Sequence, residues 1–142
     1  MTTSQTSPAD AADIAALTQK VIASWAHQDA AGFADLFIED GTMILPGAFA
    51  KGREEIRLYM KEAFESKYKN TQVTGRPLDL RFFGDGCAVL ITQGGCLAPG
   101  ESAVAEEQTI RASWVVVKRD VRWWIAAYQN SPAYRPLPVP GA

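Results

Sequence analysis

The sequence predicts an α+β fold in which three N-terminal helices pack on a strongly curved antiparallel sheet. Apolar residues recur at helical spacing through the first 64 residues, and from residue 73 onward they alternate as they do in strands. The long strands therefore follow one another along the chain, which favours an α+β fold over an α/β fold. A chain of 142 residues can bury one hydrophobic core, so we expect a single domain over residues 1–142.

The first two helices have clear start signals. Ser7 is a favourable N-cap and Pro8 fits a first turn, which predicts a helix from Pro8 to about Ala26. Its apolar stripe consists of Ile14, Leu17, Val21 and Trp25. Asp29 is expected to cap a second, shorter helix. The buried side of that helix carries Phe33, Leu36 and Phe37.

A short strand is expected between the second and third helices. Residues 39–41 should end the second helix, residues 42–45 should form the strand, and a loop should run from Pro46 to Gly52. Arg53 begins the third helix, with acidic residues in the first turn where the helix dipole favours them. The apolar stripe of this helix is Ile56, Tyr59, Met60, Ala63 and Phe64.

Four long strands are expected to complete the domain as a meander. Their ranges are residues 73–82, 87–97, 104–118 and 121–131. The first should bend near residues 75–77, and Asp85-Gly86 is a hairpin-turn signal. The proline-rich tail, residues 132–142, should be extended, and the N-terminus, residues 1–7, extended or disordered.

Composition and charge exclude several classes of function. The formal net charge is -2 and the basic residues are scattered, so we expect no nucleic-acid or membrane partner. The N-terminus has no signal-peptide pattern, which predicts a cytoplasmic protein. Cys87 and Cys96 should lie on opposite faces of one strand as reduced residues. With a single histidine and no cysteine cluster, we expect no metal and no other cofactor.

The last two predicted strands are the most apolar part of the chain. On the first, the even positions are apolar and should face the interior, namely Ile110, Ala112, Trp114 and Val116. On the second, regular alternation puts Trp123, Ile125, Ala127 and Gln129 on one face. It puts Trp124, Ala126, Tyr128 and Asn130 on the other. Because both faces are rather apolar, we expect a homodimer through the outer face of the sheet.

Three segments carry a resemblance to a known superfamily. WAHQDAAGFADLFIEDGT (25–42) and KGREEI (51–56) resemble the N-terminal half of the NTF2-like superfamily, and within it the SnoaL-like branch. WIAAYQN (124–130) is similar to the SgcJ/EcaC group, whose members accompany enediyne polyketide biosynthesis. The resemblance implies a conical fold with a pocket between the sheet and the first and third helices. It does not imply one activity, because this fold hosts isomerases, cyclases, dehydratases, oxygenases and binding modules.

The residues of one relative, ketosteroid isomerase, are missing from this chain. That enzyme uses an aspartate base and an oxyanion hole made by a tyrosine and a protonated aspartate. Here the base falls on Leu45, the tyrosine on Val21, and the second aspartate near Ala112 or Ser113. None of these side chains can supply the same chemistry. Isomerisation by that route is therefore not expected.

Four residues are candidates for a catalytic role. His27 is the only imidazole, although a position at the end of a helix more often serves capping or lies at the surface. Gln93 and Gln129 lie among apolar neighbours and could orient a carbonyl or a polyene terminus. For Gln129 and Asn130 the alternative is a cross-strand or loop-closing hydrogen bond. Tyr59 is expected to be both pocket wall and hydrogen-bond donor.

Aromatic and amide side chains define the expected ligand site. A cone with many aromatic and few charged residues suits a flat, unsaturated, hydrophobic ligand. The expected ligand-binding residues are Trp25, Phe37, Phe49, Tyr59, Met60, Phe64, Gln93, Trp114, Gln129 and Asn130.

These patterns lead to one favoured function and two alternatives. The favoured function is binding or processing of an apolar polyketide or polyene intermediate in enediyne-type natural-product biosynthesis. The first alternative is a non-catalytic accessory or dimerisation protein for a biosynthetic synthase. The second is a cofactor-independent isomerase, cyclase or hydrolase of a small ketone, which requires a carboxylate inside the cone.

Overall fold

The computed structural model describes residues 7–133, in which helices come first and the long strands follow. The elements in chain order are α1 (Pro8–Ala26), α2 (Ala30–Ala34), β1 (Phe37–Leu45), β2 (Ala48–Lys51), α3 (Arg53–Phe64), β3 (Gln72–Phe82), β4 (Cys87–Leu97), the 3-10 helix η1 (Glu106–Gln108), β5 (Ile110–Arg119) and β6 (Arg122–Pro132). Apart from Ser7, Pro132 and Ala133, the predicted N-terminal segment and tail lie outside the described residues.

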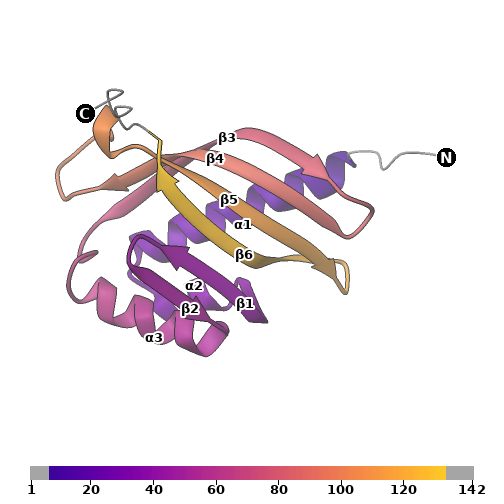
Figure 1. Ribbon diagram of the computed structural model, residues 1–142, viewed down its shortest axis with the longest axis horizontal. Coiled ribbons are helices and arrows are strands. Elements are labelled where there is room, and N and C mark those ends of the chain that lie inside the picture. Colours follow the sequence, from indigo (N-terminus) through magenta and orange to yellow (C-terminus); the bar gives the residue numbers. More distant parts are fainter. Residues whose placement is uncertain (1–6, 134–142) are drawn as a thin grey trace, which may run out of the picture.

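The strands form one curved sheet in the order β2-β1-β6-β5-β4-β3 (Figure 1). The α+β class and the antiparallel meander from β3 to β6 are as predicted. One pair departs from the antiparallel expectation, because β1 runs parallel to β6. The connection between these two strands is long and includes β2, α3 and the strands β3 to β5. A connection of this length allows parallel pairing. The sheet is therefore mixed.

The helix starts follow the capping signals. Ser7 Oγ accepts a hydrogen bond from the Asp10 backbone N–H at 3.3 Å, and Asp29 Oδ1 accepts one from the Gly32 N–H at 2.9 Å. The second helix is shorter than predicted, because Phe37 begins β1 instead of continuing α2. The Ile125 N–H donates to the Leu36 carbonyl at 2.9 Å, so pairing with β6 draws this segment into the sheet.

The predicted loop from Pro46 to Gly52 contains a strand. Leu45 pairs with Ala48 and Thr42 pairs with Lys51, so β1 and β2 form a hairpin. Gly47 lies at the turn with a φ of 79°, a value that glycine adopts without steric cost. A second boundary also differs, because residues 106–108 form a 3-10 helix and β5 begins only at Ile110.

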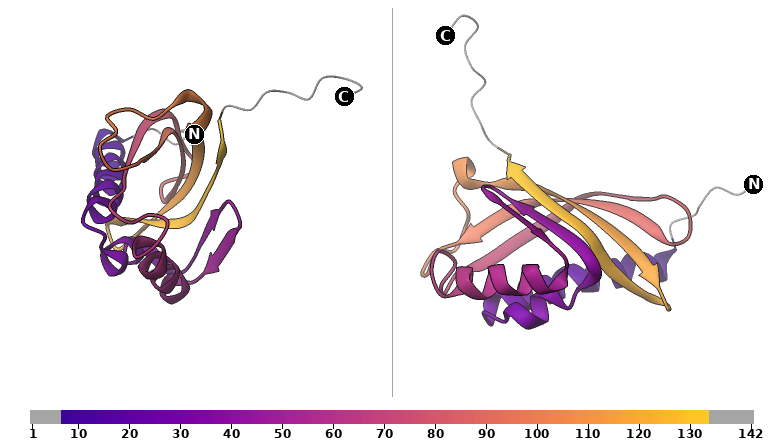
Figure 2. Two further views of the ribbon diagram at one scale, coloured as in Figure 1. Left: turned by 90° about the vertical axis from the view of Figure 1, so that its left-hand side faces the viewer. Right: turned by 60° about the horizontal axis from the view of Figure 1, so that its bottom comes forward.

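Three helices cover the concave face of the sheet (Figure 2). The predicted stripe of α1 is buried in full, comprising Ile14, Leu17, Val21 and Trp25. On α3 the buried residues are Ile56, Met60, Ala63 and Phe64, whereas Tyr59 is only half-buried. The end of α1 opposite to Trp25 is tied to the β5–β6 hairpin. Asp10 Oδ1 there accepts hydrogen bonds from Lys118 Nζ and Trp123 Nε1, both at 3.0 Å.

A bulge in β6 changes which of its side chains face the helices. Val116 pairs with Ile125 and Val115 pairs with Ala127, so Ala126 is an extra residue without a partner on β5. The inner positions are therefore Trp123 and Ile125 before the bulge, then Tyr128 and Asn130 after it. Regular alternation had placed these two pairs on opposite faces, and that prediction is wrong. The predicted inner face of β5 is confirmed, with Ala112, Trp114 and Val116 buried.

Candidate ligand-binding site

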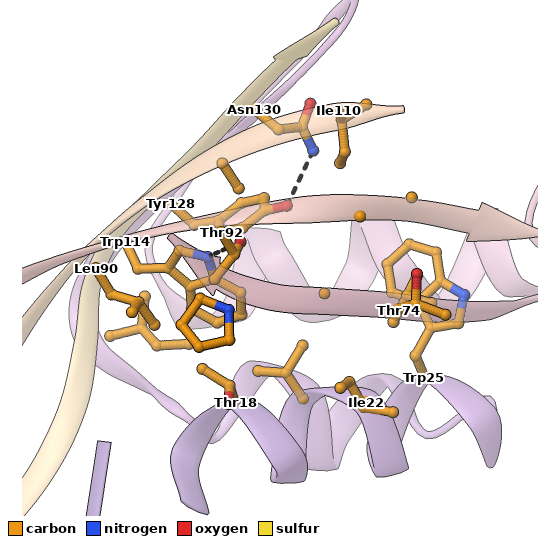
Figure 3. Close-up of a pocket in the computed structure, with 18 of the residues that line it drawn as sticks. Thr18, Ile22, Trp25, Thr74, Leu90, Thr92, Ile110, Trp114, Tyr128 and Asn130 are labelled. Atoms are coloured by element: carbon orange, nitrogen blue, oxygen red, sulfur yellow. Dashed lines mark hydrogen bonds between the residues drawn. The ribbon is translucent and has the colours of Figure 1, made fainter. Parts of the chain in front are cut away.

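A cavity of about 600 Å³ lies between α1 and the concave face of the sheet (Figure 3). Side chains from α1, α2 and every strand except β2 contribute to its wall, as do Tyr68 and the η1 residue Gln108. Within residues 7–133, no Asp, Glu, Lys, Arg or His side chain lines it. A volume of this size and an apolar, aromatic wall are typical of sites for small organic molecules.

The cavity reaches the surface between α1 and the edge strand β3. Its lining includes exposed residues on both sides of this boundary, namely Gln19 on α1 and Thr74, Gly75 and Pro77 on β3. A Cβ atom added to Gly75 would meet nothing closer than 3.9 Å, so this part of the rim has free space. The neighbouring Gly94 has no such freedom, because its Cβ would lie 2.0 Å from the Thr74 carbonyl oxygen.

The indole N–H groups of the two lining tryptophans are both paired. Trp25 Nε1 donates to Thr71 Oγ1 at 2.8 Å, and Trp114 Nε1 donates to Thr92 Oγ1 at 3.0 Å. The Trp25 ring also packs against Tyr68, with the ring centroids 4.8 Å apart. Because their polar atoms are satisfied within the wall, the tryptophans offer a ligand apolar ring surface.

One polar pair, Tyr128 and Asn130, lines the cavity from β6. Asn130 Nδ2 donates to the Tyr128 hydroxyl at 3.0 Å, while Asn130 Oδ1 is buried and has no hydrogen-bond partner among the described residues. The Tyr128 ring packs edge-on against Trp114, with centroids 4.9 Å apart. Burial raises the pKa of the Tyr128 phenol, so the hydroxyl keeps its proton at neutral pH.

Four of the predicted ligand-binding residues line this cavity. They are Trp25, Phe37, Trp114 and Asn130. Met60 and Phe64 do not line it, because both lie in the buried core on α3. Phe49 is 64% exposed on β2, on the far side of the sheet edge from the cavity. A loop had been expected here, whereas Phe49 lies in β2 and pairs with the exposed Ile44.

The two predicted glutamines point away from the cavity. Gln129 is exposed, because the bulge at Ala126 gives it an outer position. Gln93 is also an outer residue of β4, and its Oε1 accepts a hydrogen bond from Arg111 Nε at 2.9 Å. Neither amide can orient a ligand inside the cone from these positions.

Tyr59 and His27 also lie outside the cavity wall. The Tyr59 hydroxyl is buried without a hydrogen-bond partner in the described part of the chain, and Lys67 Nζ lies 5.1 Å from the centroid of its ring. His27 is exposed at the C-cap of α1, where its backbone N–H bonds to carbonyls of the last turn. The described wall of the cavity therefore contains no imidazole and no carboxylate.

Tyr128, Thr92 and the glycine rim were missed by sequence reasoning. Tyr128 and Thr92 are ordinary strand residues in the sequence, and nothing local marks the bulge that turns Tyr128 inward. Gly75 and Gly94, which face each other across β3 and β4, carried a usable signal. Glycines opposite each other in neighbouring strands often mark close backbone approach or an open site.

The fold and cavity agree with the family to which the sequence is assigned. The chain belongs to the SnoaL-like domain family, whose model matches residues 14–135. None of the curated proteins compared with the chain matches it. In the described residues, no helix is both long and apolar enough to cross a membrane. No three His, Cys, Asp or Glu residues there are grouped as metal ligands would be.

Solved structures share this architecture. A domain of unknown function with a cystatin-like fold from Nostoc punctiforme is 27% identical, with a TM-score of 0.82 over 92% of this chain and 81% of that one. An NTF2-like protein with a cystatin-like fold from Novosphingobium aromaticivorans is 18% identical (TM-score 0.74, 88% and 82%). The protein Aln2 from a Streptomyces species is 14% identical (TM-score 0.75, 91% and 94%). The last two likenesses show the NTF2-like, cystatin-like fold and nothing further.

Proposed function

We propose that this protein binds an apolar small molecule of the polyketide or polyene type in the cavity beneath α1. The observation that carries the proposal is a cavity of about 600 Å³ whose described wall contains no charged side chain. Two tryptophans contribute apolar rings to this wall, since both indole N–H groups are bonded to threonines. A flat or extended unsaturated molecule would replace water against these rings, which favours binding through burial of apolar surface.

Binding, rather than acid–base catalysis by a carboxylate or imidazole, is the activity proposed. A proton-transfer mechanism needs such a group within hydrogen-bond reach of the substrate. The wall described here offers tyrosine, threonine and amide groups instead. These groups can hold and orient a ligand, so a role in positioning or protecting a biosynthetic intermediate is compatible with them. A role in enediyne-type biosynthesis is the narrower proposal, supported by the similarity of residues 124–130 to the SgcJ/EcaC group.

Diphenylhexatriene, an apolar triene that fluoresces on leaving water, tests the binding proposal. The wild-type protein should enhance its fluorescence saturably. Gly75→Leu should abolish most of this enhancement, because an added side chain has space at the cavity rim and would occupy it. Gln129→Leu adds a similar apolar group on the outer face and should bind the probe like the wild type. Equal fluorescence in all three proteins would show that the probe binds elsewhere and would contradict the proposal.

We also propose that a second copy of this chain covers the outer face of the sheet near β1 and β2. Ile44 and Phe49 are cross-strand partners, with 39% and 64% of their surfaces exposed. Trp124, on the same face, is covered by the guanidinium groups of Arg53 and Arg122, which lie 5.6 and 4.1 Å from its ring centroid. Ile44 and Phe49 therefore leave adjacent apolar side chains uncovered at the β1–β2 hairpin.

Sedimentation velocity measures this association directly. The wild-type protein should sediment as a dimer, and Phe49→Glu combined with Ile44→Glu should sediment as a folded monomer, because two carboxylates would be buried at the interface. Arg76→Glu, a charge change on an exposed residue of the opposite sheet edge, is the matched control and should remain dimeric. A wild-type monomer at all protein concentrations would refute the proposal and leave these residues for another partner, such as a synthase.

A further inference from the structure

We propose that Tyr128 and Asn130 recognise a neutral hydroxyl group, an alcohol, phenol or enol, on an otherwise apolar ligand. This inference rests on the proposed binding function and adds the chemistry of one end of the ligand. The two residues lie two positions apart on the inner side of β6, after the bulge at Ala126. Figure 3 shows them together in the cavity, joined by the hydrogen bond from Asn130 Nδ2 to the Tyr128 hydroxyl at 3.0 Å.

The pair leaves at least one donor and one acceptor for a ligand. Tyr128 accepts from Asn130, so its own O–H remains to be donated, and Asn130 Oδ1 is a buried acceptor without a partner among residues 7–133. Exchanging the amide oxygen and nitrogen also leaves a donor and an acceptor. Tyr128 would then donate to Oδ1, the amide N–H would be the available donor and the phenol oxygen the available acceptor. The recognition pattern therefore does not depend on the amide orientation.

A hydroxyl group matches this pattern better than a carbonyl, an ether or a carboxylate. A hydroxyl both donates and accepts, so it can satisfy the unpaired acceptor and the free donor together. A ketone or ether only accepts, and it would leave the free buried acceptor of the pair without a partner. A carboxylate would bring a charge into a wall that has no described cationic side chain to compensate it.

Among the fully buried side-chain polar atoms of the described wall, Asn130 Oδ1 is the unpaired one. Trp25 Nε1 is bonded to Thr71, and Trp114 Nε1 to Thr92. Among buried side-chain polar atoms of the described residues, only Asn130 Oδ1 and the Tyr59 hydroxyl lack a partner, and Tyr59 does not line the cavity. Buried polar atoms normally find partners, and a bound hydroxyl would complete the set here.

Pyrene, 1-hydroxypyrene and 1-methoxypyrene form a matched probe set for fluorescence titration. The quantity compared is the dissociation constant of pyrene divided by that of 1-hydroxypyrene, measured for each variant. Hydration of the free probes contributes equally to every ratio, so it cancels when variants are compared. Relative to the wild type, Asn130→Leu should lower this ratio about fivefold, the effect of a neutral hydrogen bond. Tyr128→Phe, which keeps the ring and is the gentler change, should lower it by a similar factor.

Gln129→Leu is the matched control, since Gln129 lies between the two residues in sequence but on the outer face. Its ratio should equal that of the wild type. The wild-type protein should prefer 1-methoxypyrene over pyrene much less than it prefers 1-hydroxypyrene over pyrene. Ratios that are the same in all four proteins would overturn the hydroxyl inference while leaving apolar binding intact. Tighter binding of 1-pyrenecarboxylate than of 1-hydroxypyrene would also overturn it. A wild-type protein that binds neither the pyrenes nor diphenylhexatriene would contradict the proposed function itself.

Discussion

The two halves of β6 differ in what their inward side chains do. Before the bulge, Trp123 is buried away from the cavity with its indole N–H bonded to Asp10, and the buried Ile125 adds only an aliphatic side chain to the cavity wall. After the bulge, Tyr128 and Asn130 border empty space, and one amide oxygen has no partner in the described chain. One strand thus contributes first to the closed core and then to an open site. In the first half the inward polar atom is hydrogen-bonded within the protein and stabilises the fold. In the second half one inward polar atom is left without a hydrogen bond and is available to a ligand.

Truncating one inward side chain on each side of the bulge to alanine should give the largest difference in the free energy of unfolding. Trp123→Ala removes a side chain that is 4% exposed and leaves a void in the core, so the free energy of unfolding should fall by about 3–5 kcal/mol. Tyr128→Ala should cost less than half as much, because its ring already borders the cavity. Urea denaturation followed by circular dichroism measures both. Equal losses would remove the distinction between the two halves.

The ion pair beside Trp123 should make the first half sensitive to acid. Hydrogen bonds from Trp123 and Lys118 lower the pKa of the Asp10 carboxyl below its ordinary value, and its side chain is only 17% exposed. A carboxyl whose pKa is lower in the folded state stabilises the fold above its unfolded-state pKa. This contribution is lost as the pH falls through the folded-state pKa.

Asp10→Asn should therefore reduce the free energy of unfolding at neutral pH by about 1–2 kcal/mol. The gap between wild type and variant should close as the pH falls below about 4, near the ordinary aspartate pKa. Thermal unfolding from pH 7 to pH 3 measures it. Glu54→Gln is the control, since the Glu54–Arg57 pair is exposed and should have little effect. A gap that stays constant with pH would show that the Asp10 charge is not responsible.

The hairpin that leads into β6 contains a residue in an unfavourable backbone conformation. Asp120 and Val121 form its two-residue turn with φ values of 55° and 59°, and Val121 is 87% exposed. A β-branched residue in the left-handed region is strained, whereas asparagine tolerates it. Val121→Asn should raise the free energy of unfolding by roughly 0.5–1 kcal/mol. Val121→Ala should gain less, and a loss of stability in the asparagine variant would contradict this interpretation.

The smallest stability effect is expected at the unpaired amide. Asn130→Leu removes a buried acceptor without a partner, so the unliganded protein should keep its stability within about 1 kcal/mol or gain slightly. The same change should weaken binding of the hydroxylated probe, which separates a binding role from a structural one. Differential scanning calorimetry of the unliganded variant measures the stability. A loss as large as that of Trp123→Ala would place Asn130 in the structural half of the strand.

Local sequence signals predicted most of the helices and turns. The caps at Ser7 and Asp29 and the start of α3 at Arg53 depend on residues within one turn of the chain. The hairpin at Asp85-Gly86 is equally local, and it was predicted correctly. The apolar stripe of α1 and the inner face of β5 follow from periodicity, and both are buried as expected.

The sequence by itself therefore determined the fold class, the helix starts and an apolar, aromatic interior, because these depend on neighbouring residues and on composition. Only the tertiary structure decided the parallel pairing of β1 with β6 and the bulge at Ala126. The first joins segments far apart in the chain, and the second is a register shift between two neighbouring strands that no residue type in the sequence marks. A single unpaired residue then exchanges the faces of the strand. That exchange, rather than any motif, brings Tyr128 and Asn130 into the cavity and puts Gln129 outside it.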